Sequence, residues 1–313
     1  MKLTIHIGTT KTGSTSIQAF LAQNHDALRK QAVLYPTGLG PQHHVNATVA
    51  ALSYGTSPDL FRFCGITDSL AHKEFRTQMS HTLAQQVAQA GPIDHVIISS
   101  EHLHSRCVLP EDIQRFQHLF CQDFDETEIV VYVRPQIDHM VSLFSTNLRH
   151  GFNGTLDDHI TAMIGAKHAS YFNLKDVITR WINVFGKSAV TVRPFAALNR
   201  KSGGAVADFC RVAKIAADGP DMLPVAAHNV EINAKGQELL MILNQNKGIP
   251  APTRRKVVAW LEKEFNGSGL KPTPEMVQTV QAQFSQSNAW VTDTYFPKHP
   301  EYLAPAVRKD PVI

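Results

Sequence analysis

The chain alternates between short, almost continuous apolar runs and longer stretches with helical periodicity. Runs typical of strands fall at 3–8, 95–100, 128–134 and 188–195. An unbroken apolar run indicates a strand buried on both faces, as in a parallel sheet covered by helices. The pattern therefore predicts an α/β fold with ligands bound beyond the carboxyl ends of the strands.

Beyond about residue 220 the strand pattern ends and helical patterns remain. Amphipathic stretches, separated by turns that contain Gly or Pro, lie at 231–245, 253–265 and 275–296. We expect 220–313 to be a mostly helical region packed on the sheet, so that 1–313 forms a single domain. Between 35 and 75, Gly, Pro, Thr and His predict a loop with a short helix, which could line a substrate entrance.

Composition restricts the class of protein. With 313 residues, 43% of them hydrophobic, the chain can bury a substantial core. Thirty basic against 27 acidic residues leave a net charge of +3, too small for a nucleic-acid-binding coat or a membrane-surface protein. There is no apolar run of about 18 residues, and the four scattered cysteines indicate reduced thiols. We expect a cytoplasmic protein without a membrane span or a nucleic-acid partner.

The most informative stretch joins the first predicted strand to the helical pattern after it. It contains Lys11, Thr12, Gly13, Ser14, Thr15 and Ser16. A strand that turns into a helix through such residues presents backbone N–H groups to an anion. The order differs from the Walker motif of P-loop kinases, in which the lysine directly follows the second glycine. Alternatively, Ser14 or Thr15 caps an ordinary helix.

A second polar position follows the strand at 128–134. This strand ends in Arg134 and Pro135, and Ser142 follows Arg134 by eight residues, about two turns into the next helix. An arginine at the carboxyl end of a buried strand needs an anion or solvent. The sequence leaves both possibilities open.

Three side chains are candidates for taking up a proton. Glu101 directly follows the strand at 95–100, and a carboxylate at a strand end is well placed to act as a base. His44, in a loop, is the second candidate and His102 the third. Glu101 could instead cap the next helix. The histidines lack the spacing of a zinc site, so we expect no metal.

Together, the KTGSTS turn and the YVRP pattern with its later serine resemble the sulfotransferase superfamily that uses 3′-phosphoadenosine-5′-phosphosulfate (PAPS), above all bacterial members. The resemblance implies a P-loop-type parallel sheet flanked by helices. It also implies that residues 11–16 hold the 5′-phosphosulfate, with Lys11 stabilising the charge on the leaving phosphate. Arg134 and Ser142 would hold the 3′-phosphate.

The activity implied by the resemblance is transfer of a sulfuryl group from PAPS to an acceptor hydroxyl, without a metal. By analogy with bacterial relatives, the acceptor is a carbohydrate or a glycolipid. Members that act on phenols use a histidine as base and members that act on glycans use a glutamate, so Glu101, His44 and His102 all stay candidates. The alternatives are a P-loop kinase and a non-catalytic nucleotide-binding protein.

Overall fold

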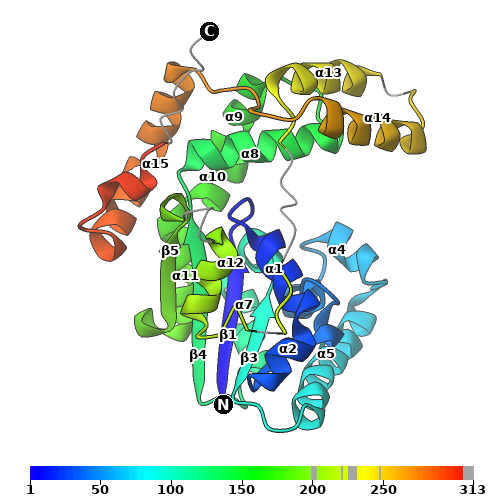
Figure 1. Cartoon of the computed structure of the whole chain (residues 1–313), viewed down its shortest axis with the longest axis vertical. Helices are drawn as coiled ribbons and strands as arrows, with labels where there is room; N and C mark the ends of the chain where they lie inside the picture. Colours follow the sequence, from blue (N-terminus) through cyan, green and yellow to red (C-terminus); the bar gives the residue numbers. More distant parts are fainter. Residues whose placement is uncertain (199–202, 220, 225–230, 247, 306–313) are drawn as a thin grey trace. The chain divides into compact units, whose positions relative to one another are not determined.

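A computed structural model of the chain describes residues 1–198, 203–219, 221–224, 231–246 and 248–305. Its strands are β1 (Lys2–Gly8), β2 (Val33–Leu34), β3 (His95–Ser99), β4 (Glu126–Val133) and β5 (Val190–Pro194). Within the described residues they form one parallel sheet in the order β2-β3-β1-β4-β5 (Figure 1). The predicted parallel α/β fold is confirmed.

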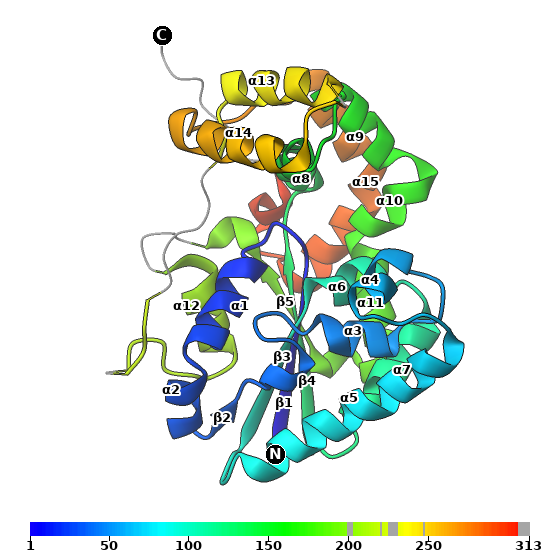
Figure 2. The same cartoon turned by 90° about the vertical axis from the view of Figure 1, so that its right-hand side faces the viewer.

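Helices cover both faces of this sheet. They are α1 (Ser14–Gln23), α2 (His25–Lys30), α3 (Val45–Ala51), α4 (Pro58–Phe63), α5 (Ser69–Gln89), α6 (Glu101–Arg106), α7 (Pro110–Phe120), α11 (Leu174–Phe185) and α12 (Gly204–Val212), with short turns η1 (Thr37–Leu39), η2 (Lys187–Ala189) and η3 (Phe195–Ala197). Figure 2 shows α1, α2 and α12 on one side of the strands and α3, α5, α7 and α11 on the other. None of the described helices is long and apolar enough to cross a membrane.

The chain divides into two compact units. The first consists of Met1–Val133 and Leu174–Val225, and the second of Arg134–Asn173 and Ala226–Ile313. The second unit contains α8 (Gln136–Arg149), α9 (Leu156–Ile164), α10 (Ala166–Phe172), α13 (Ala234–Gln245), α14 (Ala251–Glu264), α15 (Pro274–Tyr295) and η5 (Pro300–Leu303). The C-terminal region is helical as predicted, and α8, α9 and α10 group with it. That the whole chain forms a single domain stays a prediction.

Strand β1 is buried on both faces. Leu3, Ile5 and Ile7 are fully buried, and so are Thr4 and His6 between them. The core on the side of α1 and α12 is made of Ile17, Phe20, Leu21, Val130, Tyr132, Phe209 and their neighbours. Burial on both sides explains why the run in the sequence is nearly continuous.

The second unit has its own core, built around α8. Its buried members come from α8, α9, α10, α13, α14 and α15 and include Ile137, Met140, Phe144, Leu148, Ile160, Phe172, Leu240, Leu261 and Phe284. Arg254 of α14 donates to the carbonyls of Arg149 and Leu148 at 2.7 and 3.1 Å. These bonds satisfy carbonyl groups that the end of α8 would otherwise leave without an intrahelical partner.

The segment 35–75 contains more helix than predicted. It holds η1, α3, α4 and the beginning of α5, rather than a loop with one short helix. All residues of α3 except Asn46 are buried. A helix that is buried on nearly every side has no polar face and therefore no amphipathic pattern to read.

Candidate functional site

The turn between β1 and α1 has an unusual backbone. Gly8, Lys11 and Gly13 all have positive φ angles, of 78°, 64° and 87°. Glycine adopts this conformation freely, whereas for lysine it costs about 1 kcal/mol. As predicted, the residues from Lys11 to Ser16 form the strand-to-helix turn, and the backbone at Lys11 is held in a conformation that its own preferences disfavour.

Hydroxyl groups hold this turn together from inside. Thr9 donates to the Tyr132 carbonyl at 2.9 Å, which ties the turn to β4. Thr12 and Ser14 both donate to the Thr9 carbonyl, at 2.6 and 3.2 Å. Ser14 therefore does not act as the cap of α1; Gly13 occupies the N-cap position, and no side chain caps this helix.

The first turn of α1 can bind an anion. Within the described part of the chain, the backbone N–H groups of Ser14 and Thr15 have no acceptor. Such groups at the positive end of the helix dipole attract phosphate and sulfate. Thr15 is exposed, whereas Ser14 is buried.

Glu101 packs directly against this turn. Strands β1 and β3 are parallel neighbours, so their carboxyl ends meet at the same edge of the sheet. Glu101 is the first residue of α6, after β3. A Cβ atom at Gly8 would lie only 2.8 Å from the Glu101 Cα. The two backbones are therefore as close as a glycine allows.

The Glu101 carboxylate is partly buried and ionised. Gln18 of α1 donates from Nε2 to Glu101 Oε2 at 2.6 Å. Burial by itself would raise the pKa of Glu101, but the hydrogen bonds from Gln18 and from its own backbone, with nearby His102 and His43, hold the pKa below its usual range. The charged form is the one that can take up a proton.

Replacing Gly8 by alanine is expected to destabilise the protein by about 2 kcal/mol more than the same change at Gly55. Both glycines have a positive φ angle, 78° and 85°, but a Cβ atom at Gly55 meets nothing within 4 Å. Gly55→Ala thus measures the backbone strain alone. Urea unfolding gives the two free energies, and equal losses would contradict the close contact between Gly8 and Glu101.

His44 is tied to the end of β3. The backbone N–H of His44 donates to the Ser99 carbonyl at 2.9 Å, and the ring nitrogen Nδ1 of His44 accepts a hydrogen bond from the backbone N–H of Ser99 at 3.0 Å. The ring packs on Tyr35 with 4.3 Å between ring centroids. Burial, helped by His43, lowers the pKa of His44 to about 3. The ring is neutral. The lone pair of its Nδ1 already accepts a hydrogen bond from the backbone N–H group of Ser99.

His102 follows Glu101 in α6 and is partly buried. Its ring meets the ring of His43 edge to face, with 5.9 Å between the centroids. Burial lowers the pKa of His102, while the charge of Glu101 opposes this shift. His102 therefore lies beside the Glu101 carboxylate, and the charge of this carboxylate influences the pKa of His102.

His6, inside β1, is a further neutral histidine near this edge of the sheet. The side chain is fully buried, and its Nδ1 lies 2.8 Å from the Ser99 hydroxyl. Burial lowers the pKa of His6 to about 4, although the charge of Glu101 acts in the opposite direction. The fold keeps this ring uncharged at neutral pH.

We expect the free energy of unfolding to fall as the pH drops from 6.5 towards 4. In that range the histidine of an unfolded chain takes up a proton that buried His6 does not, so protons favour the unfolded state. The contribution of His6 is fully present above pH 6.5, and about 2 kcal/mol of it is lost between pH 7 and 5. Urea unfolding at both pH values measures the loss, and His6→Asn should reduce it. An equal loss in both proteins would contradict this role of His6.

Arg134 and Ser142 belong to the second unit. Arg134 follows the last residue of β4 and precedes Pro135, the N-cap of α8. Ser142 lies on α8, and both side chains are partly buried. Because these two residues and the Lys11 turn belong to different units, their sharing of one nucleotide stays a prediction.

Sequence reasoning missed Gln18, which holds the Glu101 carboxylate. The sequence did carry a signal: α1 buries Ile17, Leu21 and Phe20, and a glutamine interrupts this apolar face. A buried amide needs a hydrogen-bond partner. That partner is 83 residues away in the sequence, so only the fold identifies it.

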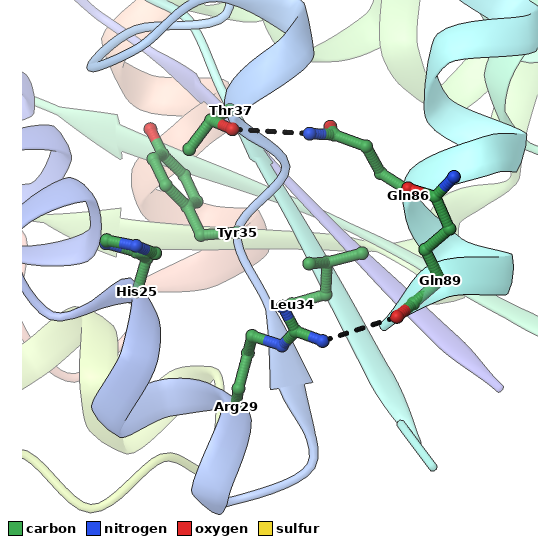
Figure 3. Close-up of a pocket in the computed structure, with 7 residues that line it drawn as sticks. All are labelled: His25, Arg29, Leu34, Tyr35, Thr37, Gln86 and Gln89. Carbon is green, nitrogen blue, oxygen red and sulfur yellow. Dashed lines mark hydrogen bonds between the residues drawn. The ribbon is translucent and has the colours of Figure 1, made fainter. Parts of the chain in front are cut away.

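A cavity of about 120 Å³ lies at the β2 edge of the sheet (Figure 3). It is lined by His25, Arg29, Leu34, Tyr35, Thr37, Gln86 and Gln89. Its polar groups bind one another: Gln86 donates to the Thr37 hydroxyl at 3.2 Å, and Arg29 donates to the Gln89 carbonyl at 3.4 Å. These bonds join α5 to η1 and to α2. None of the lining residues is a predicted site residue.

Comparisons with known proteins bear on the fold. No family model and no curated protein sequence matches this chain. A sulfotransferase from Alicyclobacillus acidocaldarius has a similar solved structure, with a TM-score of 0.51 and 13% identity over 93% of this chain and 94% of that chain. The sulfotransferase domain from the curacin biosynthetic pathway covers 90% of this chain and 96% of its own at 12% identity, but its TM-score of 0.40 is too low to support an argument. The chain has a sulfotransferase-like fold.

Proposed function

We propose that this chain is a sulfotransferase that moves a sulfuryl group from PAPS to an acceptor hydroxyl. One observation carries the proposal: a turn with open backbone N–H groups and an ionised carboxylate lie in contact at the carboxyl edge of the sheet. An anion site next to a base is what sulfuryl transfer to a hydroxyl requires. The sulfotransferase-like fold is consistent with it.

The residues of the turn fit the donor's 5′ end. The N–H groups of Ser14 and Thr15 have no acceptor within the described residues and can bind the phosphosulfate. In the reaction, the acceptor oxygen bonds to sulfur while the bond from sulfur to the 5′-phosphate oxygen breaks, which leaves 3′,5′-bisphosphoadenosine. We assign to Lys11 the stabilisation of the charge that develops on that phosphate. Thr12, Gly13 and Ser16 complete the proposed loop.

Glu101 is the proposed general base, which takes the proton of the acceptor hydroxyl. It is ionised and packs against the turn. In contrast, the Nδ1 of His44 accepts a backbone N–H group and its ring is fully buried. His102 is a neighbour of the carboxylate, and we assign to it an electrostatic part rather than proton removal.

The remaining parts of the proposal concern the other end of the donor and the acceptor. Arg134 and Ser142 are proposed to hold the 3′-phosphate, because a guanidinium and a hydroxyl are suitable donors to phosphate oxygens. This requires the two units to work as one domain. The proposed acceptor is a carbohydrate or a glycolipid, and the proposed location is the cytoplasm.

A kinase remains the second candidate for one specific reason. Glu101 begins α6 just after β3, beside a turn that could bind phosphate, and a P-loop kinase has the carboxylate that holds Mg²⁺ close to its phosphate-binding loop. The two functions differ in ligand and in metal requirement. A kinase needs ATP with Mg²⁺, whereas the proposed sulfotransferase binds 3′,5′-bisphosphoadenosine in the presence of a chelator.

Calorimetric titration and a transfer assay test the proposal together. We expect 3′,5′-bisphosphoadenosine to bind in EDTA and ATP with Mg²⁺ to bind more weakly. With sulfur-labelled PAPS, we expect label to pass to a glycan or glycolipid fraction. Tight binding of ATP only with Mg²⁺ would favour the kinase. Bisphosphate binding without transfer to any fraction would favour a non-catalytic nucleotide-binding protein.

A further inference from the structure

Gln18 is a buried amide that donates a hydrogen bond to a partly buried carboxylate. Its side chain is 2% exposed, although glutamine is usually found at the surface. Nε2 lies 2.6 Å from Glu101 Oε2, which is short for a hydrogen bond to a carboxylate. The bond joins α1 to the first residue of α6 across 83 positions of sequence.

The same helix also carries the anion-binding N–H groups. Gln18 follows Ser14 by four residues on α1, so the two side chains lie on the same face, one above the other. One turn of helix separates them, about 6 Å. A helix is rigid over this distance. Because Gln18 binds Glu101 and α1 also carries Ser14, this one helix sets the position of the Glu101 carboxylate relative to the turn around Lys11.

We propose that Gln18 is a positioning residue, which holds the Glu101 carboxylate in the orientation and charge state needed to take the acceptor proton. This inference rests on the proposed function for its catalytic meaning. The pairing suits a base because the amide donates a hydrogen bond without adding a charge. A lysine or arginine in its place would hold the carboxylate equally well but would weaken its tendency to take up a proton.

Several groups besides Gln18 face the carboxylate. His6 comes from β1, Tyr35 from the segment after β2, His43 from the next loop and His102 from α6. Burial acts on Glu101 in the direction of a higher pKa. The hydrogen bond from Gln18 lowers the pKa of Glu101 and so counteracts the effect of burial. When this bond is lost, we expect the pKa of Glu101 to rise.

The variant Gln18→Met tests the proposal, because methionine has a similar shape and no hydrogen-bond donor. We expect its turnover to fall on acidification at a higher pH than that of the parent protein, since protonated Glu101 cannot act as a base and loss of the hydrogen bond from Gln18 raises the pKa of Glu101. In the parent protein, the fall in turnover should begin at a lower pH. Gln23→Met, on the exposed end of the same helix, should behave like the parent protein.

A titration of the Glu101 carboxyl carbon by ¹³C NMR makes the test independent of activity. We expect its midpoint to lie at higher pH in Gln18→Met than in the parent protein, and an unchanged midpoint would overturn the inference. A changed midpoint with an unchanged pH profile of turnover would overturn the catalytic role. A protein that transfers no sulfuryl group would refute the proposed function, while the NMR midpoint would still decide whether Gln18 controls Glu101.

If Gln18→Met does not fold, the parent protein supplies the answer. The side-chain NH₂ resonances of Gln18 should shift with pH as Glu101 titrates. The shift should disappear in Glu101→Gln, whose amide does not titrate. If the Gln18 side-chain resonances do not shift while Glu101 titrates, the inference is overturned.

Discussion

Replacing Glu101 by glutamine is expected to lower turnover at least about 100-fold, because a general base contributes roughly 10²–10⁴-fold to a rate. An amide cannot take up the proton of the acceptor. Its oxygen can still accept the hydrogen bond that Gln18 donates to Glu101, so the side chain should stay in place. Donor binding is expected to be unchanged. Initial rates at saturating donor measure turnover, and titration with 3′,5′-bisphosphoadenosine measures binding.

Glu74→Gln is the matched control for this experiment. Glu74 is exposed on α5, so its replacement removes the same charge without touching the turn. Both turnover and donor binding should then equal those of the parent protein. Near-normal turnover of Glu101→Gln would exclude Glu101 as the base, and His102 and His44 would be tested next.

Replacing Lys11 by glycine is expected to lower kcat by about 10²–10³, the usual effect of removing one donor aimed at developing charge. Glycine is the informative substitution because Lys11 has a φ angle of 64°. Glycine relieves the strain of this conformation but loses more entropy on folding, and the two effects largely cancel. The free energy of unfolding should thus stay close to that of the parent protein, so the loss of turnover reports on the ammonium group.

Lys11→Ala separates the side chain from the backbone. It lacks the ammonium group but keeps the strained φ angle, so it should lose as much turnover as Lys11→Gly. Rates with saturating donor and urea unfolding of both variants provide the comparison. Turnover of Lys11→Gly within tenfold of the parent protein would contradict the role of Lys11. Two variants that differ strongly in kcat would show that the backbone of the turn matters more than the charge.

The long strands were predictable from the sequence, and the reason is their burial. Strands β1, β3, β4 and β5 all fall within one or two residues of the predicted runs, because a strand covered on both faces is apolar throughout. The two-residue strand β2 is too short for a pattern. The helix content of segment 35–75 was underestimated, because α3, one of its helices, is buried on nearly all sides. Periodicity reveals an element only when one face differs from the other.

The candidate site was predictable in part. The turn around Lys11 was identified because its chemistry is local: glycines permit the positive φ angles at both ends. Glu101 was identified as a residue at a strand end, but its contact with Gly8 depends on β1 and β3 being neighbours in the sheet. His44 was proposed as a base from its place in a loop, and the pattern contained no sign of its burial or of its bonds to Ser99.

By itself, the sequence determined the parallel α/β architecture, the helical character of the C-terminal region and the strand-to-helix turn at residues 11–16. These features depend on local pattern and on backbone preferences of neighbouring residues. Only the tertiary structure decided that Gln18 holds Glu101, that Glu101 is charged and that His44 and His6 are neutral. The physical reason is that hydrogen bonding and burial set the charge state of a side chain, and both come from residues far away in the sequence.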